Sequence, residues 1–176
     1  MAETFPLLGA RVRLRPFSEA DISETYVGWL NDPQVVRYSN QRFAKHTVES
    51  SQRYLAGFAG TANLFLAIER LDSGAVIGTM TAYVWVPHGT VDLGIMVGDR
   101  TAWGGGFGQD AWSTLVEWFA TQPQMRKITA GTLACNYAMI QLAKKAGMMH
   151  EATRERQEIV DGRPQDIHYY ARFTVR

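Results

Sequence analysis

The alternation of apolar and polar residues predicts a chain that changes repeatedly between strand and helix. Apolar or alternating runs predict strands at 11–15, 64–69, 75–85, 90–98, 127–134, 153–160 and 167–175. Apolar residues spaced three or four apart predict helices after Ser18, after Thr47, after the glycines near 106 and over 138–146. Strands that follow one another through short turns favour an α/β (α+β) fold. We expect one mixed, mostly antiparallel twisted sheet flanked by helices.

Capping residues and buried positions refine the helices. Ser18 and Thr47 are expected N-caps, 31–33 ends the first helix at a proline, and Gly147 closes the last helix. The residues expected to face inward are Ile22, Tyr26, Trp29 and Leu30, then Ser51, Tyr54, Leu55 and Phe58, and finally Phe107, Ala111, Leu115, Trp118 and Phe119.

The segment 103–111 joins an apolar strand to the start of an amphipathic helix. Four of its residues are glycines, namely Gly104, Gly105, Gly106 and Gly108. Because glycine has no side chain, a phosphate can approach the backbone N–H groups closely. The helix N-terminus adds a partial charge of about half an elementary charge. The sequence therefore predicts an anion-binding loop.

Two other phosphate motifs fit this loop less well. A dinucleotide-binding fingerprint needs a glycine where Gln109 stands. A nucleoside triphosphate loop needs lysine and serine or threonine after Gly108, but Gln109 and Asp110 follow it. A glycine-rich surface turn is the remaining alternative. The strand before the loop and the helix after it favour a binding site.

Two segments resemble signatures of the GNAT acyltransferase superfamily. The loop resembles its pyrophosphate-binding motif, Gln/Arg-x-x-Gly-x-Gly/Ala, with Gly106 and Gly108 at the small positions and Trp103 where Gln or Arg is commonest. The segment 136–148 is similar to a second signature, Asn-x-x-Ala/Ser-Ile-x-Leu-Tyr-x-Lys-x-Gly-Phe. The opening 12–21 resembles the branch containing ribosomal-protein N-terminal acetyltransferases. The resemblance implies a single GNAT domain over 1–176.

The resemblance further implies an enzyme that uses acetyl-CoA and transfers its acetyl group directly to a primary amine. The implied cofactor-binding residues are Met96, Val97, Trp103, Gly104, Gly105, Gly106, Phe107, Gly108, Gln109 and Asn136. A helix cap also explains Asn136. Ala143 stands where many members carry a tyrosine general acid, so a non-catalytic acyl-CoA-binding module stays open.

Proton removal is the harder half of the implied reaction. An alkylamine with a pKa near ~10 is mostly protonated at neutral pH, whereas a thiol pKa of about 8.5 makes the thiolate a tolerable leaving group. Asp92 is the first candidate base, through a water as in related enzymes, and His88 is the second. A solvated carboxylate and a loop histidine are the corresponding structural alternatives.

The acceptor is predicted from one segment and a few aromatic residues. The stretch 26–33, followed by Val35 and Tyr38, resembles one found in members that acetylate protein N-termini or small amines such as amino sugars. The candidate substrate-binding residues are Asn31, Tyr38, Tyr83 and Trp85, although aromatics at these spacings also fit a core. We expect a small amine or amino sugar, with a peptide N-terminus as the alternative.

Composition sets the outer limits of these hypotheses. Eighteen basic and seventeen acidic residues leave a net charge of +1, so no nucleic acid or membrane partner is expected. The single Cys135 excludes an internal disulfide framework and fits a reducing compartment. Without a signal-peptide core or an apolar run near the roughly 20 residues that span a bilayer, we expect a cytoplasmic protein. No metal site is expected, and a homodimer stays open.

Overall fold

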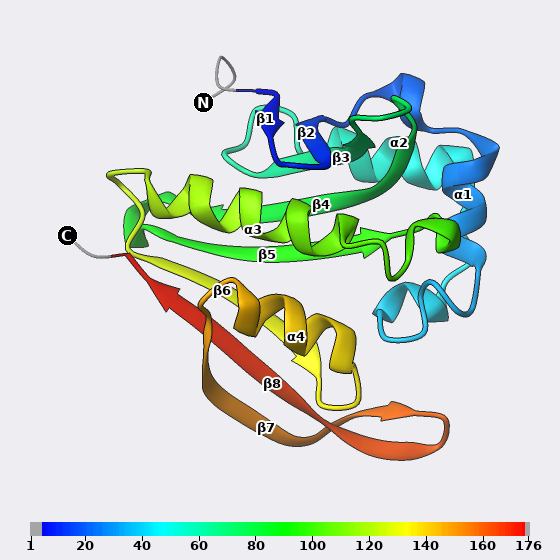
Figure 1. The fold of residues 1–176 in the computed structure, drawn as a ribbon. Helices are drawn as coiled ribbons and strands as arrows, with labels where there is room; N and C mark the ends of the chain where they lie inside the picture. The colour runs from blue at the N-terminus through cyan, green and yellow to red at the C-terminus, as the bar shows by residue number, and fades with distance from the viewer. Residues whose placement is uncertain (1–4, 175–176) are drawn as a thin grey trace.

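One eight-stranded sheet forms the centre of the computed structural model, which describes residues 5–174 (Figure 1). The spatial order is β1-β2-β3-β4-β5-β6-β8-β7. The strands are β1 (Leu7–Leu8), β2 (Val12–Pro16), β3 (Leu64–Arg70), β4 (Val76–Trp85), β5 (Thr90–Val97), β6 (Lys127–Leu133), β7 (Met149–Val160) and β8 (Arg163–Phe173). Only the β5–β6 pair is parallel. The predicted mixed, mostly antiparallel sheet is confirmed.

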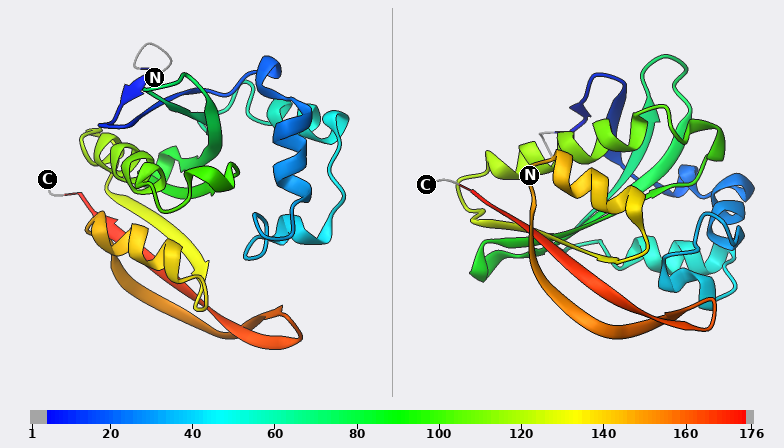
Figure 2. Two further views of the ribbon diagram at one scale, coloured as in Figure 1. Left: turned by 45° about the vertical axis from the view of Figure 1, so that its right-hand side comes forward. Right: turned by 60° about the horizontal axis from the view of Figure 1, so that its bottom comes forward.

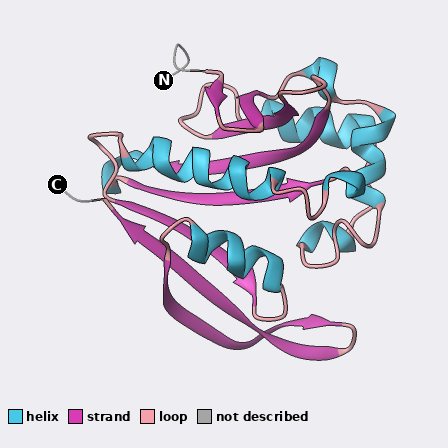
Figure 3. Ribbon diagram, in the orientation of Figure 1, coloured by secondary structure: helices cyan, strands magenta, loops and turns pink. Residues whose placement is uncertain are grey.

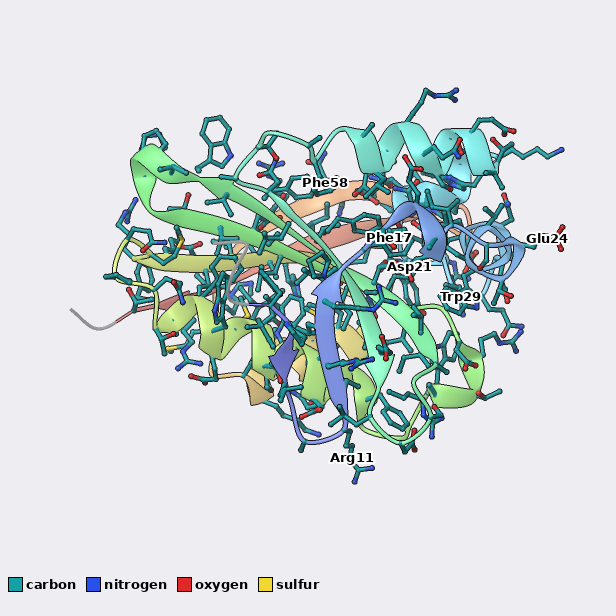
Figure 4. All side chains as sticks on the ribbon, turned by 90° about the horizontal axis from the view of Figure 1, so that it is seen from above. Arg11, Phe17, Asp21, Glu24, Trp29 and Phe58 are labelled. Carbon is teal, nitrogen blue, oxygen red and sulfur yellow. The ribbon has the colours of Figure 1, made fainter. Side chains whose placement is uncertain are left out.

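Helices cover both faces of this sheet (Figure 3). The α-helices are α1 (Glu24–Asn31), α2 (Val48–Ala56), α3 (Phe107–Ala120) and α4 (Tyr137–Lys145). Short 3-10 helices are η2 (Glu19–Asp21), η3 (Asn40–Phe43), η4 (Val86–His88) and η5 (Arg100–Ala102). Seen from above, α2 lies on one side of the sheet and α3 on the other (Figure 4). No helix among the described residues is long and apolar enough to cross a membrane.

Each face of the sheet has its own hydrophobic core. The larger core lies under α3 and α4 and contains the fully buried Trp112, Leu115 and Phe119. The smaller core lies under α1 and α2, where Phe17, Tyr26 and Phe65 pack together. In α3, Ala111, Leu115 and Phe119 are buried as predicted. Trp112 and Val116 are buried as well and were not expected, because the helix packs through a stripe wider than one row of side chains.

The parallel strands β5 and β6 separate after a short paired stretch. Their ladder joins Thr90, Val91 and Asp92 to Lys127, Ile128 and Thr129 and ends there. Figure 1 shows the two strands diverging beyond this point. The glycine-rich loop follows the free end of β5, and α4 follows the free end of β6. The two signature segments therefore lie on opposite sides of the divergence.

Some predicted boundaries were wrong. Ser18 does not cap the first helix, because it begins the 3-10 helix η2 and its N–H and hydroxyl bind the Asp21 carboxylate. The α-helix starts at Glu24, where Ser23 accepts a hydrogen bond from Tyr26 N. Thr47 caps α2 as predicted, but Phe58 lies beyond the end of that helix.

The C-terminal strands are longer than predicted. Both β7 and β8 start four residues before the expected positions 153 and 167, and residue 175 lies outside the described residues. The strand β7 is an edge strand whose residues are almost all exposed, so no apolar alternation marks its start. The two-residue strand β1 was missed because it is too short to show a pattern.

Glu69 is a buried carboxylate at the centre of an ion-pair network. It accepts hydrogen bonds from Arg13 and Arg15, and Arg15 also binds Asp21 at 2.7 Å. Burial raises the pKa of Glu69, but the hydrogen bonds from the two arginines outweigh it and hold the pKa below its ordinary value. Asp21 behaves in the same way, because the bonds from Arg15 and Ser18 outweigh its burial and lower its pKa. The network ties β2, β3 and η2 together.

Candidate functional site

A cleft of about 1280 Å³ lies where β5 and β6 diverge. One side is formed by residues of 93–109 and 131–145, and we call it the glycine half. The other side is formed mainly by residues of 26–54, and we call it the loop half. Segments far apart in sequence therefore meet at one opening.

Most of the predicted cofactor-binding residues line the glycine half. Those that line the cleft are Met96, Val97, Trp103, Gly104, Gly106, Gly108, Gln109 and Asn136. Gly105 and Phe107 do not line it. The Gly105 carbonyl accepts a hydrogen bond from Arg11, and the Phe107 ring lies 4.5 Å from the Arg70 guanidinium carbon.

The glycine-rich loop exposes the start of α3 to the cleft. Gly104 and Gly106 have φ angles of 76° and 81°, which residues with a side chain rarely adopt. Gly106 is the N-cap of α3, and no side chain of residues 5–174 caps that helix. The first-turn N–H groups therefore keep their capacity to bind an anion.

Trp103 folds the loop back onto β5. Its indole N–H donates to the Val97 carbonyl at 2.8 Å, so the side chain has a structural partner of its own. The adjoining Gly98 packs on Trp29 of α1, since a Cβ added there would lie 2.2 Å from that indole. Asp32, next to α1, adds an ion pair to Arg100 at 3.6 Å. The end of β5 is thus fixed to the loop half.

A contact that sequence reasoning missed anchors the other side of the glycine loop. The Asp110 carboxylate accepts the backbone N–H groups of Ala10, Arg11 and Val12 at 3.0, 2.7 and 3.0 Å. Arg11 then donates from Nη1 to Gly105 O at 3.3 Å, and Figure 4 labels it at the β1–β2 turn. The turn therefore places a guanidinium beside a loop that has no basic side chain of its own.

Asn136 and α4 complete the glycine half. The Asn136 side chain accepts from Met139 N at 3.3 Å, which confirms the predicted cap, and the residue also lines the cleft. Gln109 connects the two helices by donating to Ser113 Oγ and Leu142 O. Ala143 is fully buried and does not line the cleft.

Neither predicted base lines the cleft. Asp92 lies on the paired part of β5, directly before Leu93, which lines the cleft, and roughly 16 Å along the strand from Val97. Thr129 Oγ1 donates to its carboxylate at 2.6 Å. Desolvation by the surrounding strands raises the pKa of Asp92 and outweighs this bond. His88 lies at the β4–β5 turn, where its ring stacks on Trp85.

Of the predicted acceptor residues, only Tyr38 lines the cleft. The Tyr83 hydroxyl lies 2.7 Å from that of Tyr54, which does line the cleft, and Trp85 is 64% exposed outside it. Asn31 also lies outside the lining. Its side chain bonds both backbone groups of His46 at 2.9 Å, and His46 lines the cleft.

The structure therefore adds His46 to the candidates, and no local signal in the sequence marks it. Its Nε2 lies 3.1 Å from the Gln41 carbonyl oxygen. A carbonyl can only accept, so Nε2 carries the hydrogen and Nδ1 of the neutral ring keeps a lone pair.

Two tyrosines of the cleft lining are further from ionisation than free tyrosine. Burial raises the pKa of Tyr26 to about 12, and burial with the Tyr83 hydrogen bond raises the pKa of Tyr54, so both phenols stay protonated at neutral pH.

Comparisons with known proteins identify the family and the fold. A family model described as an acetyltransferase (GNAT) domain matches residues 11–149. A search of curated proteins finds no match.

Solved structures of acetyltransferases share the fold at low identity. A GNAT-family acetyltransferase from Bacillus anthracis aligns with a TM-score of 0.81 and 16% identity, covering 97% of this chain and 99% of that one. The ribosomal-protein alpha-N-acetyltransferase RimL, in complex with coenzyme A, aligns with a TM-score of 0.81 and 15% identity, and the alignment covers 96% of each chain. A spermidine N-acetyltransferase from Vibrio cholerae, in complex with CoA and spermine, aligns with a TM-score of 0.81 and 16% identity. This alignment covers 93% of this chain and 95% of that one. Since the family model spans most of the sequence, the chain belongs to the GNAT acetyltransferase domain family.

Proposed function

We propose that this chain is an acetyl-CoA-dependent N-acetyltransferase whose acceptor is a small primary amine. The observation that carries the proposal is the uncapped, glycine-bounded N-terminus of α3 at the free end of β5, inside a cleft of about 1280 Å³. A diphosphate fits this position because it needs several N–H donors and close backbone approach.

The residues present fit the cofactor. Backbone N–H groups between Trp103 and Gln109 hold its pyrophosphate, and Arg11 supplies a positive charge beside them. Met96, Val97 and Asn136 line the cleft where the strands diverge and hold the remaining arm. Acetyl-CoA supplies an acetyl group on a thioester, from which an amine can take it with release of a thiol.

The loop half binds the acceptor in this proposal. Its segment around 37–42 is tied to the tip of the β7–β8 hairpin, which reaches toward it in Figure 2. Arg37 binds Asp161 at 2.9 Å, and Arg42 binds Glu158 at 3.5 Å and Ile159 O at 3.2 Å. The partly buried Arg42 contacts hold this wall of the loop half in place, and a bounded pocket suits a small amine better than an extended chain. The neighbouring structures include enzymes named for a protein N-terminus and for spermidine, so the fold alone favours neither.

His46 takes the proton from the acceptor amine in this proposal, in place of Asp92 and His88. It lines the loop half, and the bond from Nε2 to Gln41 O leaves Nδ1 as the accepting nitrogen. Asn31 fixes its backbone from α1. A general base has to reach the amine directly or through one water, which the cleft position allows.

The test is thiol release from acetyl-CoA with a panel of amines, together with calorimetric binding of acetyl-CoA. We expect saturable binding without an amine and thiol release that depends on one. Binding without release for any amine would support the alternative of a non-catalytic acyl-CoA-binding module. No binding at all would contradict the proposal.

A further inference from the structure

The lining of the loop half carries positive charge, and the carboxylates near it lie outside the lining. Arg37 and Lys45 line it, whereas no Asp or Glu occurs in the cleft lining that the structure describes. The chain as a whole is nearly neutral, with a net charge of +1. The bias is therefore local to this cleft.

Nearby carboxylates are engaged outside the lining. Asp32 accepts from Gln34 N at 2.8 Å and pairs with Arg100. Glu158 pairs with Arg42. Asp161 pairs with Arg37, but the two side chains are 70% and 55% exposed, so water screens their attraction and an anion in the cleft can compete. Lys45 has no ion pair among the described residues.

These cations are not needed for the cofactor phosphates. The glycine loop offers its own N–H groups, with Arg11 beside it, and Lys145 of α4 lines the same half of the cleft. Arg37 and Lys45 come from the opposite half, between α1 and α2. Their charge is available to the acceptor.

We propose, resting on the acetyltransferase function above, that the acceptor is a small primary amine carrying an acid group, either carboxylate or phosphate. Lys45 and Arg37 bind the acid group, which charge-assisted hydrogen bonds favour. The same positive surroundings disfavour the protonated amine and so favour the neutral nucleophile. A polyamine would meet repulsion and find no carboxylate to bind.

The transfer step balances without a further reactant. The amine nitrogen bonds to the thioester carbonyl carbon, and the carbon–sulfur bond breaks with its electron pair on sulfur. His46 Nδ1 accepts the proton lost from nitrogen, and that proton goes through solvent to the thiolate. The products are an N-acetylated acid and the free thiol of coenzyme A.

The experiment compares matched amines by thiol release. The pairs are glycine with glycinamide and 2-aminoethyl phosphate with ethanolamine, alongside spermidine and an uncharged-side-chain tripeptide amide. We expect kcat/KM to be at least about tenfold higher for an acid-bearing member, as a charge-assisted bond supports. The amine of glycinamide is less basic than that of glycine, so a larger fraction of it is neutral and reactive at neutral pH. A preference for glycine therefore reports binding of the acid group. The pair with the larger ratio of kcat/KM shows whether the site prefers a carboxylate or a phosphate.

Variants of Lys45 locate the effect. Lys45→Gln should raise the KM for the acid-bearing amine about tenfold and leave the KM for its acid-free partner unchanged. Lys45→Arg should restore most of the preference for the acid-bearing amine. Lys144→Gln, an exposed lysine of α4 outside the cleft lining, is the control and should change neither. Equal or better turnover of the acid-free amines, spermidine or the tripeptide amide would overturn this inference and leave the acetyltransferase proposal standing. Absence of thiol release with every amine would contradict both.

Discussion

In the glycine half of the cleft, the groups proposed to bind the cofactor phosphates are backbone N–H groups, whereas the groups proposed to bind the acceptor in the loop half are side chains. In the glycine half, Gly104 and Gly106 shape the chain and the first turn of α3 supplies donors. In the loop half, Lys45 and His46 lie in irregular chain that Asn31 and the β7–β8 hairpin hold in place. Backbone donors suit a group common to a whole family, while side chains can change with the acceptor. The two halves should therefore respond separately to substitution.

The largest expected effect is on the glycine half. Gly106→Val should weaken acetyl-CoA binding by roughly 100-fold or more, because a β-branched side chain is strained at this φ and stands where the phosphates approach. Calorimetry measures the affinity. Gly162→Val is the matched control, since Gly162 has a φ of 74° in the β7–β8 turn with nothing within 4 Å of an added Cβ. Wild-type affinity in a folded Gly106→Val protein would refute the phosphate assignment.

The next effect belongs to the loop half. His46→Gln should lower kcat by roughly 100-fold, because the proton acceptor is lost. Acetyl-CoA affinity should stay near wild type. Asp92→Asn and His88→Gln are the contrasts, and both should stay within about twofold of wild-type kcat. A large loss in Asp92→Asn with an unchanged His46→Gln protein would return the role of base to Asp92.

A smaller effect concerns stability outside both halves. Glu69→Gln should lower the free energy of unfolding by about 2 kcal/mol, since it removes charge from a buried group bonded to two arginines. Urea denaturation measures it, and acetyl-CoA affinity should not change. A variant of full stability would show that the network contributes little.

The same network predicts a direction for acid sensitivity. Glu69 and Asp21 have lowered pKa values in the folded state, so their stabilisation is present above the ordinary carboxyl pKa near ~4 and is lost as pH falls through the lowered values. Urea midpoints measured between about pH 5 and pH 2 should fall less steeply in Glu69→Gln than in the wild type. Equal slopes would contradict the assigned pKa shifts.

The smallest expected effect is at Arg11. Arg11→Gln should weaken acetyl-CoA binding about fivefold without changing kcat, because it removes one charge beside donors that remain. Arg53→Gln, an exposed arginine of α2, is the control. An unchanged affinity for acetyl-CoA in Arg11→Gln would show that Arg11 does not bind the cofactor and only holds the Gly105 carbonyl.

The two halves also differ in how far sequence alone predicted them. The glycine loop, the α3 start and the Asn136 cap are local, so motif and periodicity located them. Contacts 15 and 94 residues away along the chain hold His46 in the cleft and Arg11 beside the glycine loop, and no local pattern records such contacts. The exposed β7 lacked apolar alternation, and a 3-10 turn held by Asp21 displaced the expected first helix.

The most direct test of this account measures both Michaelis constants in two variants. With the preferred acceptor from the matched panel, Gly106→Ala should raise the KM for acetyl-CoA and leave the KM for the amine near wild type. Lys45→Gln should raise the KM for the amine and leave the KM for acetyl-CoA near wild type. If both variants raised the same constant, or each raised both constants equally, the division of the cleft into a cofactor side and an acceptor side would be wrong.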